Sequence, residues 1–317
     1  MQESYIDRIK KINEVKKYFE KELEKELNLI KVPSPLFVSE DSGLQDSLTG
    51  TEKAISFKKD NTTYEIVHSL AKWKRDALGR YKFPVHMGLY TNMKAIRKDE
   101  NIDNIHSLYV EQWDWEKVIN KEDRNIEYLK STVNSIYNSI RKTSLYLKRK
   151  YHIFLNLPKN VYFITSQELE DMYKEKSSSE REELIVKKER AVFIIGIGNK
   201  LKSGKPHDLR SPDYDDWNLN GDLLIYDDII NRAVEVTSMG IRVDEKSILN
   251  QLNASNCNNR IELPYHQNII NKKLPYTIGG GIGESRLLML LLQKKHIAEV
   301  QTSCWDEVKD INKYGIL

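Results

Sequence analysis

A glycine-rich segment, residues 279–286, has the residue types to bind a flat, charged ligand. Gly279, Gly281 and Gly283 alternate along it, and Arg286 stands three residues after the last of them. Because alternating glycines remove the Cβ atoms from one face of an extended strand, a flat ligand can lie directly on the backbone. The apolar run that follows is typical of a buried helix, whose first turn would present Arg286 and free N–H groups to that ligand. The segment favours a base carrying phosphates, with a glycine-rich turn before a core helix as the open alternative.

The two commonest nucleotide-binding motifs are absent from the sequence. The stretch from Gly198 to Lys205 has one residue too many for the phosphate loop G-x-x-x-x-G-K-[ST]. The dinucleotide motif G-x-G-x-x-G begins at Gly196, but Leu201 occupies the position of its third glycine.

Polar side chains alternate along a predicted strand in the first half of the chain. Gln112, Asp114 and Glu116 point to one face of the sheet, whereas Trp113 and Trp115 point to the other. A polar face on a strand is explained either by solvent or by a ligand site.

Two carboxylates lie in or beside apolar strands of the second half. Asp222 starts one predicted strand and Glu235 interrupts another, with Ser238 and Arg242 close behind. Such carboxylates can hold Mg²⁺ while it bridges phosphates. Ordinary strand-end carboxylates are the alternative.

Two further segments concentrate polar groups. Residues 68–75 offer the Ser69 hydroxyl and several cations, including Lys74, where a strand passes into a helix. This arrangement suits carboxylate binding, or it is a solvated basic helix face. Residues 207–216, which contain Asp215, form an acidic loop or a weaker candidate for a metal site.

The elements that must position these residues follow from hydrophobic spacing. Apolar residues at three- and four-residue intervals predict helices at 6–27, 71–78, 126–150, 166–190, 245–253 and 264–272. The predicted strands are 29–37, 64–67, 87–96, 106–115, 191–197, 222–226 and 233–238.

The order of these elements predicts an α+β fold in which a mostly antiparallel β-sheet is flanked by helices, because strands and helices do not alternate regularly. Residues 87–115 read as an antiparallel hairpin around a charged loop. Pro33 and Pro35 make the early strand an edge or a bulge. In the helical region 166–190, Ser179 and Glu182 predict a capping box after a serine-rich break.

Composition restricts the class of protein. The 317 residues can bury a large core, and 50 basic against 47 acidic residues give a net charge of only +3. Extended nucleic-acid binding is not suggested by that charge. Two cysteines exclude a disulfide framework and indicate a reducing compartment, and no apolar run is long enough to span a membrane. We therefore expect a cytoplasmic protein with no nucleic-acid partner and no membrane partner.

The order of the motifs resembles the three signature motifs of class II aminoacyl-tRNA synthetases, in the aspartyl and asparaginyl branch. A long helix is followed by Pro35, then by a hairpin with Arg97 and a charged loop, then by Gly-x-Gly-x-Gly-x-x-Arg. The match is more specific to the ammonia-dependent asparagine synthetases, the aspartate–ammonia ligase family. The segments that carry it are GLQDSL, VHSLAKWKR, GLYTNMKAIR, EQWDWE, DYDDWN, NGD, SMGIRVD and TIGGGIGESR.

This resemblance implies a class II synthetase-like catalytic core. An aspartyl-type synthetase needs an OB-fold of roughly one hundred residues for the anticodon before its first motif. Here that motif begins by about residue 20, so we expect one catalytic domain spanning residues 1–317 and no anticodon-binding domain. The family reaction amidates L-aspartate with ammonia to L-asparagine, releasing AMP and pyrophosphate through a β-aspartyl-AMP intermediate.

The resemblance also implies roles for individual residues, with ATP as co-substrate and Mg²⁺ as cofactor. Arg97 should grip the α-phosphate and Arg286 the γ-phosphate, while Asp222 and Glu235 carry the metal. The ATP set comprises Arg97, His106, Arg210, Asp222, Glu235, Gly279, Gly281, Gly283 and Arg286. The aspartate set comprises Asp46, Ser69, Lys74, Gln112, Asp114, Ser238 and Arg242. The catalytic set comprises Asp46, Arg97, Gln112, Asp215 and Arg286.

Some alternatives stay open from the sequence alone. Either Asp46 or Asp215 could bind ammonium and take its proton. A synthetase paralogue could pass the adenylated amino acid to another acceptor, and a regulatory module could keep the fold without catalysis. A glutamine-dependent route needs a nucleophilic cysteine, which neither Cys257 nor Cys304 is placed to supply. The first class II motif usually builds a two-fold interface, so we expect a homodimer.

Overall fold

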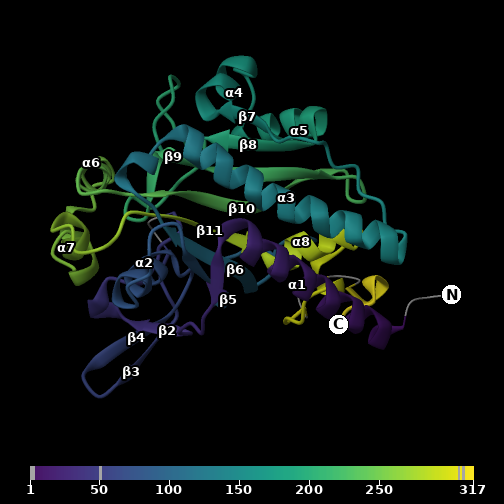
Figure 1. The fold of residues 1–317 in the computed structure, drawn as a ribbon, viewed down its shortest axis with the longest axis horizontal. Helices are drawn as coiled ribbons and strands as arrows, with labels where there is room; N and C mark the ends of the chain where they lie inside the picture. Colours follow the sequence, from purple (N-terminus) through teal and green to yellow (C-terminus); the bar gives the residue numbers. More distant parts are fainter. Residues whose placement is uncertain (1–3, 50–51, 306–307, 309–310) are drawn as a thin grey trace.

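A mixed β-sheet forms the centre of the molecule in a computed structural model, which describes residues 4–49, 52–305, 308 and 311–317 (Figure 1). Within these residues the sheet has eight strands in the order β1-β5-β6-β11-β10-β9-β8-β7, and a three-stranded sheet, β2-β4-β3, lies beside it. The outer pairs β1–β5 and β7–β8 are parallel, and every pair between them is antiparallel. The predicted α+β fold with a mostly antiparallel sheet is confirmed.

The secondary-structure elements follow the predicted order. The strands are β1 (Leu29–Lys31), β2 (Phe37–Ser39), β3 (Ser56–Lys59), β4 (Thr62–Ile66), β5 (Gly88–Ile96), β6 (Tyr109–Val118), β7 (Tyr162–Thr165), β8 (Ala191–Ile195), β9 (Asp215–Asp227), β10 (Arg232–Arg242) and β11 (Thr277–Gly283). The α-helices are α1 (Tyr5–Leu27), α2 (Ala71–Arg80), α3 (Ile126–Tyr151), α4 (Ser166–Met172), α5 (Ser178–Glu189), α6 (Ser247–Ala254), α7 (Pro264–Ile270) and α8 (Glu284–Leu291). Short 3₁₀ turns are η1 (Glu40–Ser42), η2 (Lys121–Asp123), η3 (Asn258–Arg260), η4 (Ile297–Glu299) and η5 (Ile311–Tyr314).

One face of the sheet is covered by the long helices α1 and α3, together with α8 (Figure 1). Helix α1 begins where the Ser4 side chain accepts the Asp7 N–H, and it ends at Asn28 in the left-handed conformation. Its apolar side includes Phe19, which packs on Trp113 of β6 with ring centroids 4.6 Å apart. Both tryptophans of β6 are fully buried on this face, so their polar neighbours must point the other way.

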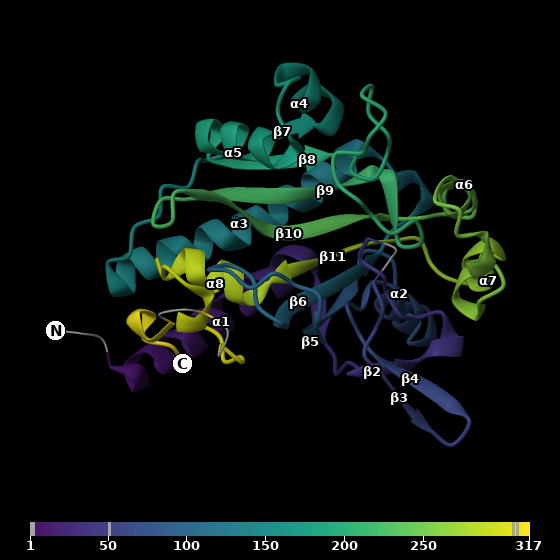
Figure 2. The ribbon, with the colours of Figure 1, turned by 180° about the vertical axis from the view of Figure 1, so that it is seen from behind.

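The opposite face carries helices only towards its ends (Figure 2). Helix α5 packs over β8, β9 and β10, and α2 packs over β5, β6 and β11. The middle of β6, β11 and β10 lies between them, where the glycines and the polar side chains of the sequence motifs are found.

A β-bulge in β10 interrupts the regular alternation of side-chain directions along that strand. The pairing shifts register between Glu235, which faces Leu224, and Thr237, which faces Leu223. Because a bulge inserts one residue, Glu235 and Ser238 point to the same face although they are three residues apart.

Several predicted boundaries are corrected. Strand β9 begins at Asp215 rather than 222, which places Asp215 opposite Arg242. Strand β6 begins at Tyr109, so His106 lies in the preceding loop and not on the strand. The capping box of α5 uses Ser177 and Glu180, two residues earlier than predicted.

None of the helices in the described residues combines the length and the apolar character needed to cross a bilayer.

Candidate active site

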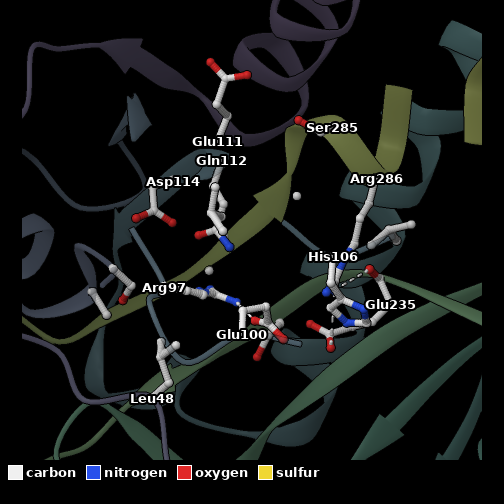
Figure 3. Close-up of a pocket in the computed structure, with 18 of the residues that line it drawn as sticks. Leu48, Arg97, Glu100, His106, Glu111, Gln112, Asp114, Glu235, Ser285 and Arg286 are labelled. Atoms are coloured by element: carbon white, nitrogen blue, oxygen red, sulfur yellow. Dashed lines mark hydrogen bonds and ion pairs between the residues drawn. The ribbon is translucent and has the colours of Figure 1, made fainter. Parts of the chain in front are cut away.

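A cavity of about 1090 Å³, including its open mouth, lies over β6, β11 and β10 on the face away from α1 and α3 (Figure 3). Most of the predicted site residues line it: Ser69, Lys74, Arg97, His106, Gln112, Asp114, Arg210, Asp215, Glu235, Ser238, Arg242, Gly281, Gly283 and Arg286. The predicted residues that do not line it are Asp46, Asp222 and Gly279. Side chains from well-separated segments of the chain therefore meet in one place.

The glycines of β11 make room for side chains of the neighbouring strands. A Cβ on Gly281 would lie 2.5 Å from the Gln112 amide oxygen and 2.7 Å from an Asp114 oxygen. A Cβ on Gly279 would overlap the Glu116 carboxylate, which explains why Gly279 lies beneath an ion pair and not on the cavity wall. The protein's own polar groups, rather than a ligand alone, lie on the glycine backbone.

Arg97 and Arg286 bring two cations to one end of the cavity from different elements (Figure 3). Arg97 follows β5, and its nearest carboxylate oxygen, on Glu100, is 3.9 Å away. Its buried Nε has no hydrogen-bond partner among the described residues. Burial, and next the Arg286 charge, lower the pKa of Arg97 from its ordinary value. A partly exposed guanidinium with a buried, unpaired Nε–H beside a second cation is suited to a multiply charged anion.

Arg286 and His106 are held at this end by the loop before β6. Arg286 Nε donates to the Ile105 carbonyl at 3.2 Å, and its Nη1 lies 3.9 Å from a Glu235 carboxylate oxygen. His106 Nδ1 lies 2.7 Å from Asp103, which fixes the imidazole against the cavity wall.

Asp222 and Glu235 lie on the adjacent strands β9 and β10 as a candidate metal pair. Asp222 is buried in an ion pair with Arg210. Burial raises the pKa of Asp222 in spite of the favourable Arg210 charge, and the nearby Glu235 carboxylate raises it further. The Glu235 carboxylate is 41% exposed and remains open to a cation beside Asp222.

No group of three or more acidic, histidine or cysteine side chains in the described residues could hold a metal ion by itself. Mg²⁺ is commonly bound by one or two carboxylates and completed by substrate phosphates and water. The two carboxylates therefore fit a magnesium ion that arrives with a nucleotide.

Arg242 connects two carboxylates at the other end of the cavity. Its Nη2 donates to Glu116 at 2.7 Å, and its Nη1 pairs with Asp215. Arg242 is 2% exposed, so both pairs are shielded from solvent. Burial raises the pKa of Asp215, and the Arg242 charge opposes that rise. Gly240 leaves room for the Asp215 carboxylate beside Arg242, because a Cβ at position 240 would lie 2.8 Å from an Asp215 oxygen.

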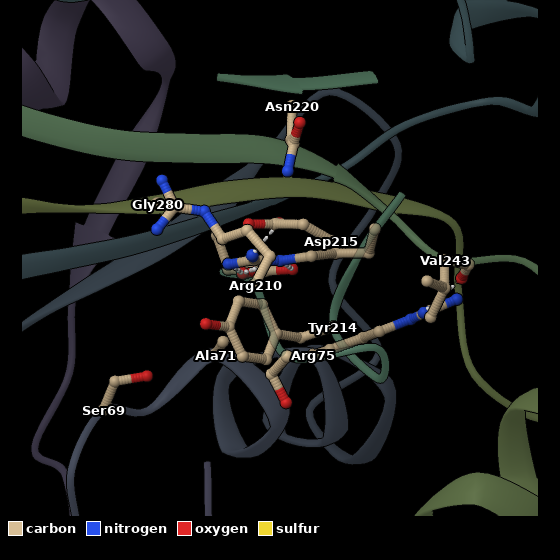
Figure 4. A network of polar contacts seen from close by, with 12 residues as sticks. Ser69, Ala71, Arg75, Arg210, Tyr214, Asp215, Asn220, Val243 and Gly280 are labelled. Carbon is tan, nitrogen blue, oxygen red and sulfur yellow. Dashed lines mark hydrogen bonds and ion pairs between the residues drawn. The ribbon is translucent and has the colours of Figure 1, made fainter. Parts of the chain in front are cut away.

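The start of α2 forms the facing wall (Figure 4). Lys74 Nζ donates to the Gly280 carbonyl at 3.1 Å and lies 3.3 Å from Asp114. Asp46 is wholly buried behind this wall, where its carboxylate accepts the Ser69 hydroxyl and the Ala71 N–H, each at 2.5 Å. Asp46 therefore orients Ser69 and the first turn of α2, and it does not face the cavity.

The lining residues outside the predicted set include Tyr214, Ser107, Gln301 and Leu48. Tyr214 directly precedes Asp215 in the polar loop of residues 207–216. The prediction of Asp215 as a site residue could therefore have indicated Tyr214 as well. Ser107 donates to Gln301 Oε1 at 2.7 Å, and Gln301 Nε2 donates to the Tyr109 carbonyl at 2.9 Å. No sequence pattern marks Gln301, because its segment follows the last helical motif without regular spacing.

Comparisons with known proteins agree with this geometry. A family model described as aspartate–ammonia ligase matches residues 6–314. A curated aspartate–ammonia ligase of Clostridium perfringens is 58% identical over 300 residues, which cover 93% of this chain and 89% of that protein. One of Clostridium tetani is 55% identical over 301 residues, covering 93% of this chain and 88% of that protein.

Solved structures show the same fold. The asparaginyl-tRNA synthetase of Pyrococcus horikoshii complexed with asparaginyl-adenylate is similar with a TM-score of 0.67 at 13% identity, over 93% of this chain and 68% of that chain. The Entamoeba histolytica enzyme in complex with asparaginyl-adenylate gives 0.65 at 14% identity. There the match covers 95% of this chain and 66% of the synthetase. The predicted resemblance to a class II synthetase catalytic core is confirmed for the fold.

Proposed function

The chain belongs to the aspartate–ammonia ligase family and makes L-asparagine from L-aspartate and ammonia with ATP, and we propose that it does so through a β-aspartyl adenylate in the cavity described above. A free carboxylate is a poor acyl donor, so the reaction needs a leaving group on the β-carboxyl carbon. An oxygen of the aspartate β-carboxylate attacks the α-phosphorus of ATP and releases pyrophosphate. Ammonia then attacks the β-carbonyl carbon of the mixed anhydride, loses a proton and releases AMP.

The facing cations Arg97 and Arg286 are the observation that carries this proposal. Both reach into one end of the cavity, and Arg97 keeps a buried donor free. Arg97 binds the α-phosphate and stabilises the charge that develops there, while Arg286 binds the γ-phosphate and His106 adds a third contact. The adenine base lies towards the β5–β6 hairpin.

Asp222 and Glu235 would hold the magnesium ion, and Arg210, which pairs with Asp222 and lines the cavity, binds the phosphates. When bound, Mg²⁺ supplies charge neutralisation for the phosphate oxygens.

The aspartate substrate occupies the opposite end of the cavity, between the start of α2 and the glycine strand. Lys74 and Arg242 bind its carboxylates, and Asp114 binds its ammonium group. Gln112, Ser69 and Ser238 supply neutral hydrogen bonds along the same walls.

Asp215 is the better of the two carboxylates for binding ammonium and taking its proton. It lines the cavity beside the proposed aspartate position, whereas Asp46 lies behind Ser69. Burial raises the pKa of both carboxylates, which suits proton removal from an ammonium ion, so access to the cavity decides in favour of Asp215.

The test of the adenylate route is AMP and pyrophosphate formation from ATP, Mg²⁺ and L-aspartate, with and without ammonium chloride. We expect aspartate-dependent exchange of labelled pyrophosphate into ATP without ammonium, and AMP equal to asparagine with it. Formation of ADP and phosphate would refute the adenylate route.

Three substitutions test the assigned roles. Arg97→Ala should lower pyrophosphate exchange by about 10²- to 10³-fold, because it removes a preorganised donor at the reacting phosphorus. Asp215→Asn should keep exchange and lose asparagine release, whereas Asp46→Asn should weaken both steps together. If instead Asp46→Asn keeps exchange and loses asparagine release while Asp215→Asn weakens both steps, Asp46 is the base.

We also propose a homodimer, in which α1 and the segment from β1 to Pro35 form the two-fold interface of the first class II motif. The exposed side chains of Ile30 on β1 and of Leu36, directly after Pro35, support that arrangement.

A further inference from the structure

A buried carboxylate outside the cavity, Asp213, joins four separate parts of the chain. It is 0% exposed, and its Oδ2 lies 3.1 Å from Lys72 Nζ, 3.0 Å from Arg260 Nη1 and 3.0 Å from His266 Nε2. Its Oδ1 accepts the Ser211 hydroxyl at 2.9 Å. None of the cavity roles assigned above uses this group.

The ion pair between Asp213 and Lys72 connects the two walls of the aspartate end of the cavity. Lys72 lies in the first turn of α2, between the lining residues Ala71 and Lys74. On the other side, Asp213 is followed directly by the lining residues Tyr214 and Asp215.

The two walls are also linked indirectly, because Arg75 Nη1 donates to the Val243 carbonyl at 2.7 Å and the Val243 N–H donates to the Tyr214 carbonyl at 2.9 Å. The Ser211 N–H donates to the Leu48 carbonyl at 3.0 Å, which ties the polar loop to the segment after Asp46. The Tyr214 hydroxyl reaches the same carbonyl at 3.4 Å. Lys72 is therefore the one residue of α2 for which a bond to this loop is recorded among the described residues.

The carboxylate is ionised in this environment. Burial by itself would raise the pKa of Asp213, but Lys72, His266 and Arg260 together hold it well below its ordinary value. A buried ion pair fixes the separation of its partners, because neither charge can leave without its counter-charge.

We propose that Asp213 and Lys72 are positioning residues that set the separation of Ser69 and Lys74 from Asp215, and with it the fit of the aspartate substrate. The inference rests on the proposed binding of aspartate at this end of the cavity. A displacement of about 1 Å in a positioning contact can cost about 10²-fold in rate, so loosening one wall should act on aspartate and spare ATP at the other end.

The test compares Lys72→Met with Arg260→Met. Both remove a cation from the same oxygen of Asp213 at nearly the same distance, but only Lys72 lies on α2. Lys72→Met should raise the KM for aspartate at least tenfold in pyrophosphate exchange and change the KM for ATP less than twofold. Arg260→Met should change either KM less than threefold, and Lys72→Arg should restore part of the aspartate affinity.

Thermal unfolding of each variant separates positioning from simple loss of stability, because kinetics are compared well below every midpoint. Equal effects of Lys72→Met and Arg260→Met, or equal effects on aspartate and ATP, would overturn the inference.

Calorimetric titration of aspartate into the protein distinguishes this inference from the adenylate route. If wild-type protein shows no pyrophosphate exchange, the route fails, but the affinity of the Lys72 variant for aspartate still tests the positioning role. An unchanged affinity in that titration contradicts it.

Discussion

At the scale of single residues, the arrangement of charges at the phosphate end of the cavity lowers the stability of the ligand-free protein. Arg97 is partly buried, and after this burial the nearby Arg286 charge disfavours its cationic form. The recorded counter-charges, Glu100 and Glu235, lie 3.9 Å away, further than a close ion pair. Such an arrangement stores unfavourable free energy that an anionic ligand relieves on binding.

Replacing Arg97 by methionine should therefore separate stability from binding. We expect Arg97→Met to unfold at the wild-type temperature or about 1–3 °C above it, because a partly buried like-charge contact is removed. The stabilisation by ATP, about 2.7 kcal/mol for wild type at 100 times its Kd, should be largely lost. Thermal unfolding with and without ATP measures both effects.

Arg190→Met is the matched control, since this arginine pairs with Asp228 away from the cavity. It should keep the ATP-induced shift. An Arg97→Met protein that retains the full shift would show that Arg97 does not bind the nucleotide.

A second prediction concerns pH and the buried Asp227 at the end of β9. Its Oδ1 accepts the Ile229 N–H at 2.7 Å, whereas its Oδ2 has no partner among the described residues. Burial raises the pKa of Asp227, so the folded protein holds this proton more tightly than the unfolded chain does. Stability is consequently lost as pH rises through the folded-state pKa.

Asp227→Asn removes that penalty and should raise the urea midpoint near pH 8, with the gain disappearing below the ordinary aspartate pKa. The neighbouring Asp228→Asn, on an exposed side chain, should give no gain. A gain of equal size at low and neutral pH would rule out ionisation as its cause.

Most of the residues that sequence reasoning assigned to the site meet in the cavity, because their types and spacing are unusual for a strand or a loop. Gln112 and Asp114 were placed by simple alternation, and Arg97 and Arg286 by their motifs. The same reasoning could not distinguish Asp46 from Asp215. Both are acids in polar segments, and only the packing of α2 shows that Asp46 faces inward while Asp215 faces the cavity.

At the scale of elements, the strand β11 decides how the aspartate end is shaped. Its glycines let side chains from β6 cross over its backbone, which brings Gln112 and Asp114 onto the cavity floor. A strand with ordinary side chains at these positions would push the polar groups towards the solvent.

Gly281→Ala should accordingly raise the KM for aspartate about tenfold or more while the protein stays folded. The new Cβ meets flexible side-chain ends, the Gln112 and Asp114 oxygens, rather than backbone, so these groups can move aside. Pyrophosphate exchange at varied aspartate measures the change. Gly79→Ala is a suitable control because its Cβ would come no closer than 3.3 Å to the Leu274 side chain. Wild-type aspartate KM in Gly281→Ala would show that Gln112 and Asp114 do not bind this substrate.

Helix α1 stabilises the phosphate end from the other face of the sheet. Lys16 pairs with Glu284, the first residue of α8, and Glu20 accepts the Trp113 Nε1–H at 2.9 Å. Arg286 follows Glu284 by two residues, so the position of this cation depends on a helix about 270 residues away in sequence. Hydrophobic spacing predicted both helices, but it contains no information on such polar contacts between them.

At the scale of the whole molecule, the class of fold was predictable and the strand order was not. Most of the long strands were visible in their local pattern, although β3 and β7 were not predicted, and the hairpin of β5 and β6 followed from adjacency. The neighbours β6 and β11 are separated by about 160 residues, and nothing local in either strand specifies the other. Long-range pairing is decided by packing of the buried faces, where Trp113, Trp115 and Ile282 belong to one core.

The last prediction is the state of association. If the first class II motif forms the interface, the protein should sediment as a dimer of twice the 37.1 kDa chain mass. Ile30 on β1 is 46% exposed and Leu36 is 52% exposed, so a charge at either position faces solvent in a monomer and is buried in the proposed dimer. Ile30→Lys and Leu36→Lys should therefore give monomers, because burying an unpaired charge costs several kcal/mol. Leu249→Lys on α6, at a site 38% exposed and away from this segment, should stay dimeric. Sedimentation equilibrium of the variants decides between the outcomes: a wild-type monomer would remove the proposed dimer, and a dimer that survives both substitutions would place the interface on another surface.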